Sequence, residues 1–156
     1  MATKEPITIN GVSTVGFNVC DTVGNGGKNR TDNGDVMLIQ AMLHALANSD
    51  GVPAASRVGL TSMSQVPEPT GTFDAKTQHA ILSYQRRWHQ VLLRVDGVIH
   101  PASYQRRNIL FGRPGERLMT ITHFHHQLLS STNLLPDYTI ELTRKFPRLA
   151  PLLRPC

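Results

Sequence analysis

The clearest helix of this chain lies within residues 71–88, which read GTFDAKTQHAILSYQRRW. Asp74 is suited to cap the start of this helix, because its carboxylate can accept hydrogen bonds from the free N–H groups of the first turn. At helical spacing the stretch forms one largely apolar face, made of Phe73, Thr77, Ala80, Ile81, Tyr84 and Trp88. A face of this kind packs against a core. We therefore expect this helix to be the spine of the core, with Trp88 inside it.

A first helix is expected just upstream, after a polar start at residues 32–35. Its apolar residues recur at the spacing of one helical face: Val36, Ile39, Leu43 and Leu46. Residues 48–70 contain three prolines together with Gly51 and Gly59, and this composition is typical of an exposed loop. Downstream, a turn at Asp96-Gly97 leads to Pro101, a residue type favoured at the first position of a helix. We expect a third helix from Pro101 to about Leu110.

The two ends of the chain show the alternation of strands. Residues 1–31 alternate apolar and polar side chains before a glycine-rich run, which predicts one or two short strands. Similar alternation in Leu118–Phe124 and Tyr138–Thr143 predicts a C-terminal β-hairpin, and the basic tail 144–156 is expected on the surface. The predicted fold class is α+β, in three parts: N-terminal strands in 1–31, a three-helix bundle in 32–112, and a hairpin with a basic tail in 113–156.

Two segments share one spaced pattern. Each has a glycine, an apolar residue two positions later and a hydroxyl residue further on: Gly71, Phe73 and Thr77 in the first, Gly97, Ile99 and Ser103 in the second. The glycine suits a tight turn with positive φ, and the hydroxyl suits the first turn of a helix. We expect the second and third helices to be entered in the same way.

In three separated blocks the chain resembles the peptidoglycan-binding domain family of the three-helix type. The blocks are Asp35, Val36, Ile39, Gln40 and Leu43; Gly71, Phe73, Thr77, Ala80, Ile81, Tyr84 and Gln85; and Asp96, Gly97, Val98 and Ile99. The resemblance covers about half of the chain. It implies a three-helix fold, and it implies the glycan or the peptide stems of the bacterial cell wall as the ligand.

Two motif residues, Gln40 and Gln85, have two possible roles. A buried glutamine must satisfy its amide, and it can do so by holding the Asp96-Gly97 turn or a helix end. Contact with a ligand is the alternative. We favour the structural role.

Candidate ligand-binding residues lie where basic and aromatic side chains gather outside the apolar face. They are Arg86, Arg87, His89, Tyr104, Arg106 and Arg107. Guanidinium groups can bind carboxylates, and flat rings can pack on sugar or amide faces. The alternative for the arginines is a solvated face without a ligand.

The sequence indicates binding without catalysis. Its 11 acidic residues include no evident pair of carboxylates for glycan hydrolysis, and neither cysteine nor any serine lies in a nucleophile motif. His123, His125 and His126 raise the hypothesis of a zinc-dependent wall hydrolase, but the sequence has no HExxH or comparable ligand set. We expect no catalytic residue, no metal and no cofactor.

Charge and cysteine content narrow the setting. The 156 residues are enough for one compact domain, and the net charge of +5 favours anionic partners. Such partners include nucleic acid, acidic lipid and the carboxylates of the wall. Nucleic acid is disfavoured, because no recognition motif is visible. No stretch is long and apolar enough for a membrane span, and the N-terminus lacks the apolar run of a secretory signal. For this reason we expect Cys20 and Cys156 to be free thiols rather than a disulfide.

Two functions follow as hypotheses. The first is a bacterial or phage protein that binds peptidoglycan without cleaving it and positions a partner at the wall. It would be made in the cytoplasm and reach the periplasm or wall by a route other than the general secretory one. The second is a protein–protein adaptor of a secretion or toxin assembly, which the flanking segments and the missing signal favour.

Overall fold

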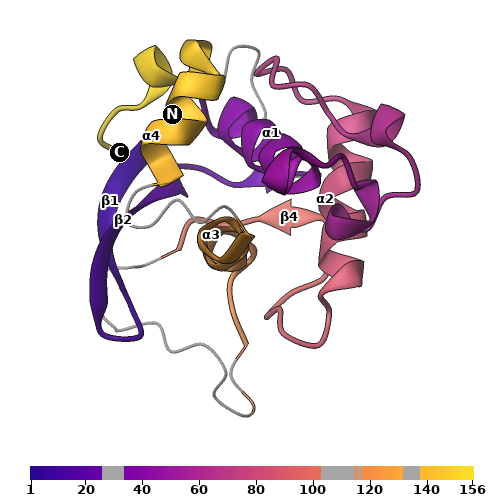
Figure 1. Ribbon diagram of the computed structural model, residues 1–156, viewed down its shortest axis with the longest axis horizontal. Coiled ribbons are helices and arrows are strands. Elements are labelled where there is room, and N and C mark those ends of the chain that lie inside the picture. Colours follow the sequence, from indigo (N-terminus) through magenta and orange to yellow (C-terminus); the bar gives the residue numbers. More distant parts are fainter. Residues whose placement is uncertain (26–33, 103–114, 116, 132–137) are drawn as a thin grey trace.

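The computed structural model describes residues 1–25, 34–102, 115, 117–131 and 138–156. The α+β class is confirmed, with helices beside two small antiparallel sheets. The α-helices are α1 (Gly34–Ala47), α2 (Ala75–Arg87), α3 (Thr120–Ser131) and α4 (Tyr138–Lys145); the strands are β1 (Ala2–Ile9), β2 (Val12–Val19), β3 (Val23–Gly24) and β4 (Val98–Ile99); and the 3-10 helices are η1 (Ser49–Gly51), η2 (Ala55–Val58), η3 (Met63–Gln65) and η4 (Pro147–Leu152). Figure 1 shows the β1–β2 hairpin on one side, α2 on the other and α1 between them.

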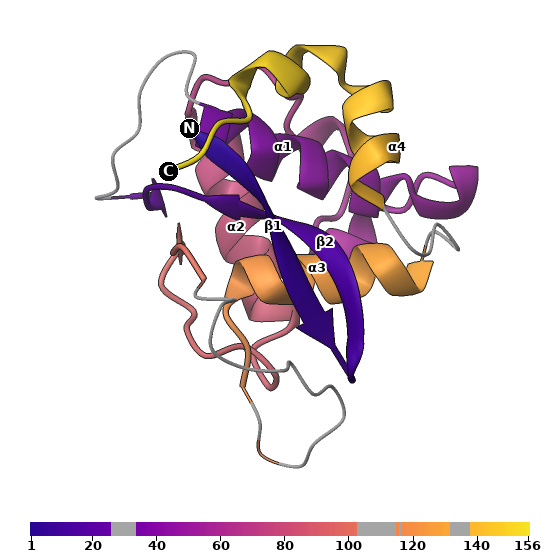
Figure 2. The ribbon, with the colours of Figure 1, turned by 90° about the vertical axis from the view of Figure 1, so that its left-hand side faces the viewer.

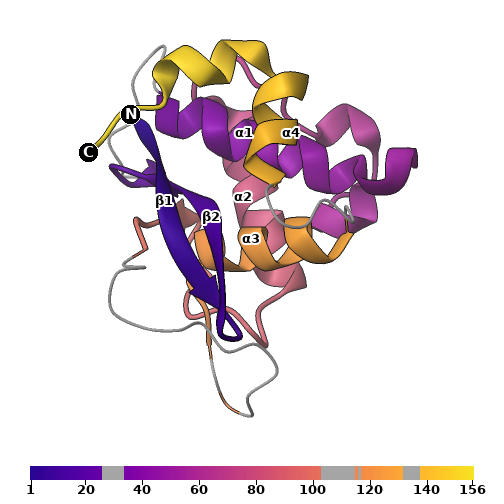
Figure 3. The same ribbon diagram turned by 60° about the vertical axis from the view of Figure 1, so that its left-hand side comes forward.

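The N-terminal strands predicted from the alternation are confirmed. β1 and β2 pair antiparallel around a turn at Asn10 and Gly11, both with positive φ, as tight hairpin turns require. Ile7, Phe17 and Val19 are buried. Figures 2 and 3 show the hairpin lying across the helices, and β2 contacts α3 and α4.

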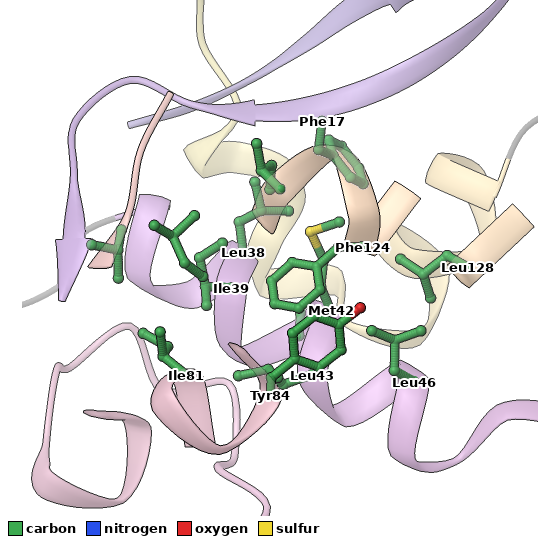
Figure 4. Packing of buried hydrophobic residues seen from close by; sticks show 14 of the residues in the cluster. Phe17, Leu38, Ile39, Met42, Leu43, Leu46, Ile81, Tyr84, Phe124 and Leu128 are labelled. Atoms are coloured by element: carbon green, nitrogen blue, oxygen red, sulfur yellow. The ribbon is translucent and has the colours of Figure 1, made fainter. Parts of the chain in front are cut away.

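The first helix is also confirmed, and it is the centre of the core. Nearly every residue of α1 is buried, so it is apolar on more than one face. Figure 4 shows its side chains Leu38, Ile39 and Met42 among residues of the hairpin, α2 and α3. One cluster of buried apolar residues runs from Ala2 to Leu149.

The second helix begins as predicted. The Asp74 carboxylate accepts hydrogen bonds from the backbone N–H of Thr77 at 2.8 Å and from its hydroxyl at 2.6 Å. Ala80, Ile81 and Tyr84 are fully buried. Trp88 ends the helix and packs against the core with part of its ring at the surface.

The segment between α1 and α2 was expected to be an exposed loop, and this was wrong for most of its apolar residues, although Val52 is exposed. Its regular structure consists of three short 3-10 helices, η1, η2 and η3. Ala55, Val58, Leu60 and Val66 are buried. Because these side chains contribute to the core, the segment lies on the helices instead of projecting into solvent.

The predicted C-terminal β-hairpin is wrong, because both of its segments are helical. In α3, Ile121, Phe124 and Leu128 are buried at the spacing of one helical face. In α4, Tyr138 and Leu142 are buried, whereas Ile140 is exposed. Over so few residues, the apolar side chains of a helix can also look like the alternation of a strand.

The basic tail does not simply lie on the surface, and the two cysteines are not free thiols. Leu149 of η4 is fully buried, and the Arg154 N–H donates a hydrogen bond to the Ala2 carbonyl at 2.8 Å. This course brings Cys156 to Cys20, and the two form a disulfide. A long separation along the chain did not exclude closeness in space.

The third helix predicted from Pro101 lies mostly in 103–114, outside the described residues; Pro101 and Ala102 themselves are not helical. Among the helices that the structure describes, none is long and apolar enough to cross a membrane.

Candidate functional site

Gln40 of α1 holds the entry to α2. Its Nε2 donates to the Thr72 carbonyl and to the Thr77 hydroxyl, both at 2.9 Å. Its Oε1 accepts from the Gly71 N–H at 2.9 Å. The buried amide is therefore fully used within the protein.

Gln85 of α2 repeats this arrangement at the next turn. Its Nε2 donates to the Val98 carbonyl and to the Thr120 hydroxyl, both at 3.0 Å, and its Oε1 accepts from the Gly97 N–H at 2.7 Å. The structural role predicted for both glutamines is confirmed. The hydroxyl partner in the second case is Thr120 at the start of α3, so α3 occupies the place relative to Gln85 that α2 occupies relative to Gln40.

A cavity of about 300 Å³ opens where the ends of α1 and α2 meet η1, η2 and α3. We call it the arginine cavity. Its lining residues are Leu46, Ser49, Arg57, Tyr84, Arg87, Trp88 and Gln127. The volume is at the lower end of the range of small-molecule sites, roughly 300–1,000 Å³. None of these lining residues, all from the described part of the chain, is acidic.

Arg57 is fixed in place by backbone carbonyls. Its Nη1 donates to the Ser49 carbonyl at 2.7 Å and to the Val52 carbonyl at 2.8 Å. A guanidinium group has five N–H donors, of which Nη1 supplies two. The donors of Nε and Nη2 have no acceptor in the described part of the chain.

Arg87 lies over the indole ring of Trp88, with its Cζ 4.8 Å from the ring centroid. This cation–π contact holds the guanidinium beside the cavity. Within the described ranges Arg87 has no ion pair with a carboxylate. The buried Nε1 donor of Trp88 likewise has no hydrogen-bond acceptor there.

The floor of the cavity is tied to α3 through Tyr84. The Tyr84 hydroxyl lies 2.7 Å from Nδ1 of His123. Burial raises the pKa of Tyr84, and burial together with the nearby His126 lowers the pKa of His123 to about 4. At neutral pH the phenol and the imidazole are therefore both uncharged, and they share one hydrogen bond whose direction depends on the imidazole tautomer. Figure 4 shows Tyr84 and Leu46 close together in the packed interior.

Gly59 allows the Arg57 segment to pack closely on α2. It has φ of +78°, and a Cβ there would lie 2.3 Å from the Ser83 carbonyl oxygen. We predict that Gly59→Ala destabilises the protein by roughly 3 kcal/mol, because backbone strain and steric overlap add. Gly51→Ala is the matched control, since φ is +69° but no atom lies within 4 Å; it should cost only about 1 kcal/mol. Urea unfolding of both variants tests this, and equal losses would contradict it.

The candidate ligand residues separate in the structure. Arg86, Arg87 and His89 are exposed at the end of α2, but only Arg87 lines the arginine cavity. His89 Nδ1 is hydrogen bonded to the Arg86 carbonyl at 3.0 Å. The other three candidates, Tyr104, Arg106 and Arg107, lie outside the described residues.

The three histidines lie on a helix and not on a strand. His123 and His125 are buried, and they point to different neighbours: His123 to Tyr84, and His125 to the Phe17 carbonyl, to which its Nε2 donates. His126 lies on the same side as His123, with ring centroids 6.3 Å apart. In the described ranges no group of three or more His, Cys, Asp or Glu side chains is placed to hold a metal ion.

Sequence reasoning missed Ser49, Arg57 and Gln127 as cavity residues. Two of them lie in the segment taken for an exposed loop, and the third lies between the two strands of the predicted hairpin. One signal was available: Ala55, Val58 and Leu60 are apolar residues within a polar, proline-rich stretch. Such residues indicate that a loop packs on the core and brings its polar neighbours with it.

Comparisons with protein-family models, with curated proteins and with solved structures found no match to this chain. The functional argument therefore rests on the residues and their geometry.

Proposed function

We propose that this protein binds peptidoglycan without cleaving it, and that the arginine cavity is its binding site. The observation that supports this most is the repeated glutamine arrangement. Gln40 and Gln85 are residues of the motif that resembles the peptidoglycan-binding domain family, and each holds a glycine turn and the start of the next helix. On this reading α1, α2 and α3 are the three helices of the module.

The cavity supports binding and not hydrolysis. Cleavage of glycans generally requires two carboxylates across the substrate, and none of the cavity's lining residues is acidic. Its polar groups are two guanidiniums, a hydroxyl and an amide beside aromatic rings. Such a set can hold an anionic ligand but offers no evident general acid.

The disulfide supports action outside the reducing cytoplasm. Disulfides persist in the periplasm and on cell surfaces and are rare in the cytosol. A bond between Cys20 and Cys156 therefore fits a protein that meets the wall.

Retention on purified sacculi at low salt tests the proposal. The wild type should pellet with the sacculi, and Arg57→Gln/Arg87→Gln should reduce the affinity roughly tenfold or more, since hydrogen bonds to charged groups contribute about 1.5–3 kcal/mol each. Arg86→Gln/Arg148→Gln is the control, because it removes the same charge from exposed positions outside the cavity.

Absence of the wild type from the pellet would overturn the proposal. Equal losses in both double variants would instead assign retention to net charge and overturn the role of the cavity. The adaptor hypothesis would then be tested by native mass spectrometry with the products of neighbouring genes.

A further inference from the structure

We infer that the arginine cavity binds the free carboxylate of a short peptide, so that the peptide stems of the wall, and not its glycan strands, are the ligand. The inference rests on the proposed function and specifies its ligand. It comes from the balance of donors and acceptors in the cavity.

The hydrogen-bonding groups available in the cavity are mostly donors. Arg57 keeps three N–H donors after its two bonds to backbone carbonyls, and Arg87 presents a guanidinium with no carboxylate partner in the described residues. A carboxylate has only acceptors when ionised and complements such a set.

A glycan fits the same cavity poorly. Each sugar hydroxyl donates as well as accepts, so a bound glycan needs acceptors from the protein. Among the described lining residues, Ser49 and Gln127 offer a non-aromatic side-chain oxygen that can accept, and none is a carboxylate. Several hydroxyl donors would remain without partners, which is costly in a partly buried site.

The two arginines differ in how they are held, so the cavity has one fixed and one adjustable cation. Arg57 is bound to the carbonyls of Ser49 and Val52, whereas Arg87 is exposed and lies over the Trp88 ring. Leu46 and the partly exposed Trp88 ring supply apolar lining in the same cavity. A terminal carboxylate between the guanidiniums would thus place a small side chain, such as that of alanine, on apolar surface.

Trp88 makes the site directly observable, because it is the single tryptophan of the chain. The probes are the peptide acetyl-Lys-D-Ala-D-Ala, its C-terminal amide and chitotetraose. The acid peptide should change the Trp88 emission in a saturable way. The amide should bind roughly tenfold or more weakly, because it lacks the charge, and chitotetraose should cause no change.

Arg87→Gln should weaken the acid peptide roughly tenfold and leave the amide unchanged, which removes the preference between them. Arg86→Gln is the matched control, since it is adjacent, exposed and outside the cavity lining; it should keep the preference. Far-ultraviolet circular dichroism establishes that both variants are folded.

Two results separate this inference from the proposed function. If sacculi retain the protein but the acid peptide causes no change, or binds no better than its amide, the peptide-carboxylate inference is overturned and wall binding stands. If sacculi do not retain the protein, the proposed function itself is overturned. Saturable binding of chitotetraose would also overturn the inference, in favour of the glycan.

Discussion

Reduction of the Cys20–Cys156 disulfide should lower the free energy of unfolding by roughly 5 kcal/mol, because the bond closes a very long loop in the unfolded chain. The two cysteines are separated by 136 positions in sequence. Opening the bond also frees the end of the tail, whose Arg154 N–H is bonded to the Ala2 carbonyl. Urea unfolding with and without a phosphine reductant measures the difference.

The control for this prediction is the double variant Cys20→Ser/Cys156→Ser. It should be as unstable as the reduced wild type, and reductant should not change its urea midpoint. An unchanged midpoint for the reduced wild type would contradict the prediction. Since typical domains are stable by about 5–15 kcal/mol, a loss of this size would leave a substantial unfolded fraction in the least stable case.

The elements that could be predicted from the sequence are those whose pattern is long or whose end is marked. α2 has the Asp74 cap and an apolar face that continues to Trp88. The β1–β2 hairpin alternates over two full strands around Asn10 and Gly11. In both cases local preference and burial agree.

α3 and α4 could not be predicted because their apolar residues fit two periods over a short window. Phe124 belongs to an alternating pattern with Leu118 and also to a helical pattern with Ile121 and Leu128. In α4, alternation includes Ile140, but this side chain is 58% exposed. Only the packing on α1 and β2 decides which residues are buried.

The arginine cavity could not be predicted because it joins residues distant in sequence. Leu46, Arg57, Trp88 and Gln127 come from separate elements, and the turn of Gly59 and the bond from Tyr84 to His123 bring those elements together. Arg87 was identified as a candidate from its charge alone. Its difference from Arg86 appears only in three dimensions.

Acid should destabilise the protein strongly between about pH 6.5 and pH 4. The pKa of His123 is lowered to about 4 by burial and, to a smaller extent, by the nearby His126. The pKa of His125 is also lowered to about 4, because burial outweighs the opposing hydrogen bond to the Phe17 carbonyl. Both folded pKa values lie below the unfolded value of about 6.5. The unfolded chain therefore binds more protons in this range, and stability is complete above it and lost as the pH falls. At about 1.36 kcal/mol per pKa unit, the loss is roughly 3 kcal/mol for each histidine.

The measurement is the free energy of unfolding in urea at intervals from about pH 7.5 to pH 4.5. His125→Gln keeps an N–H donor for the Phe17 carbonyl and removes one of the histidines with a lowered pKa, so it should lose clearly less stability on acidification than the wild type, by up to roughly 3 kcal/mol. His89→Gln replaces an exposed histidine and should follow the wild type.

Burial of Asp35 raises the pKa of its carboxyl and acts in the opposite sense, since folding then favours the protonated acid. The effect of Asp35 operates at pH values above its unfolded pKa near 3.8. Asp35 therefore reduces the loss of stability at the acid end of the range, and it does so equally in all the variants compared. If His125→Gln lost as much stability as the wild type, the buried imidazoles would not be the cause of the acid sensitivity.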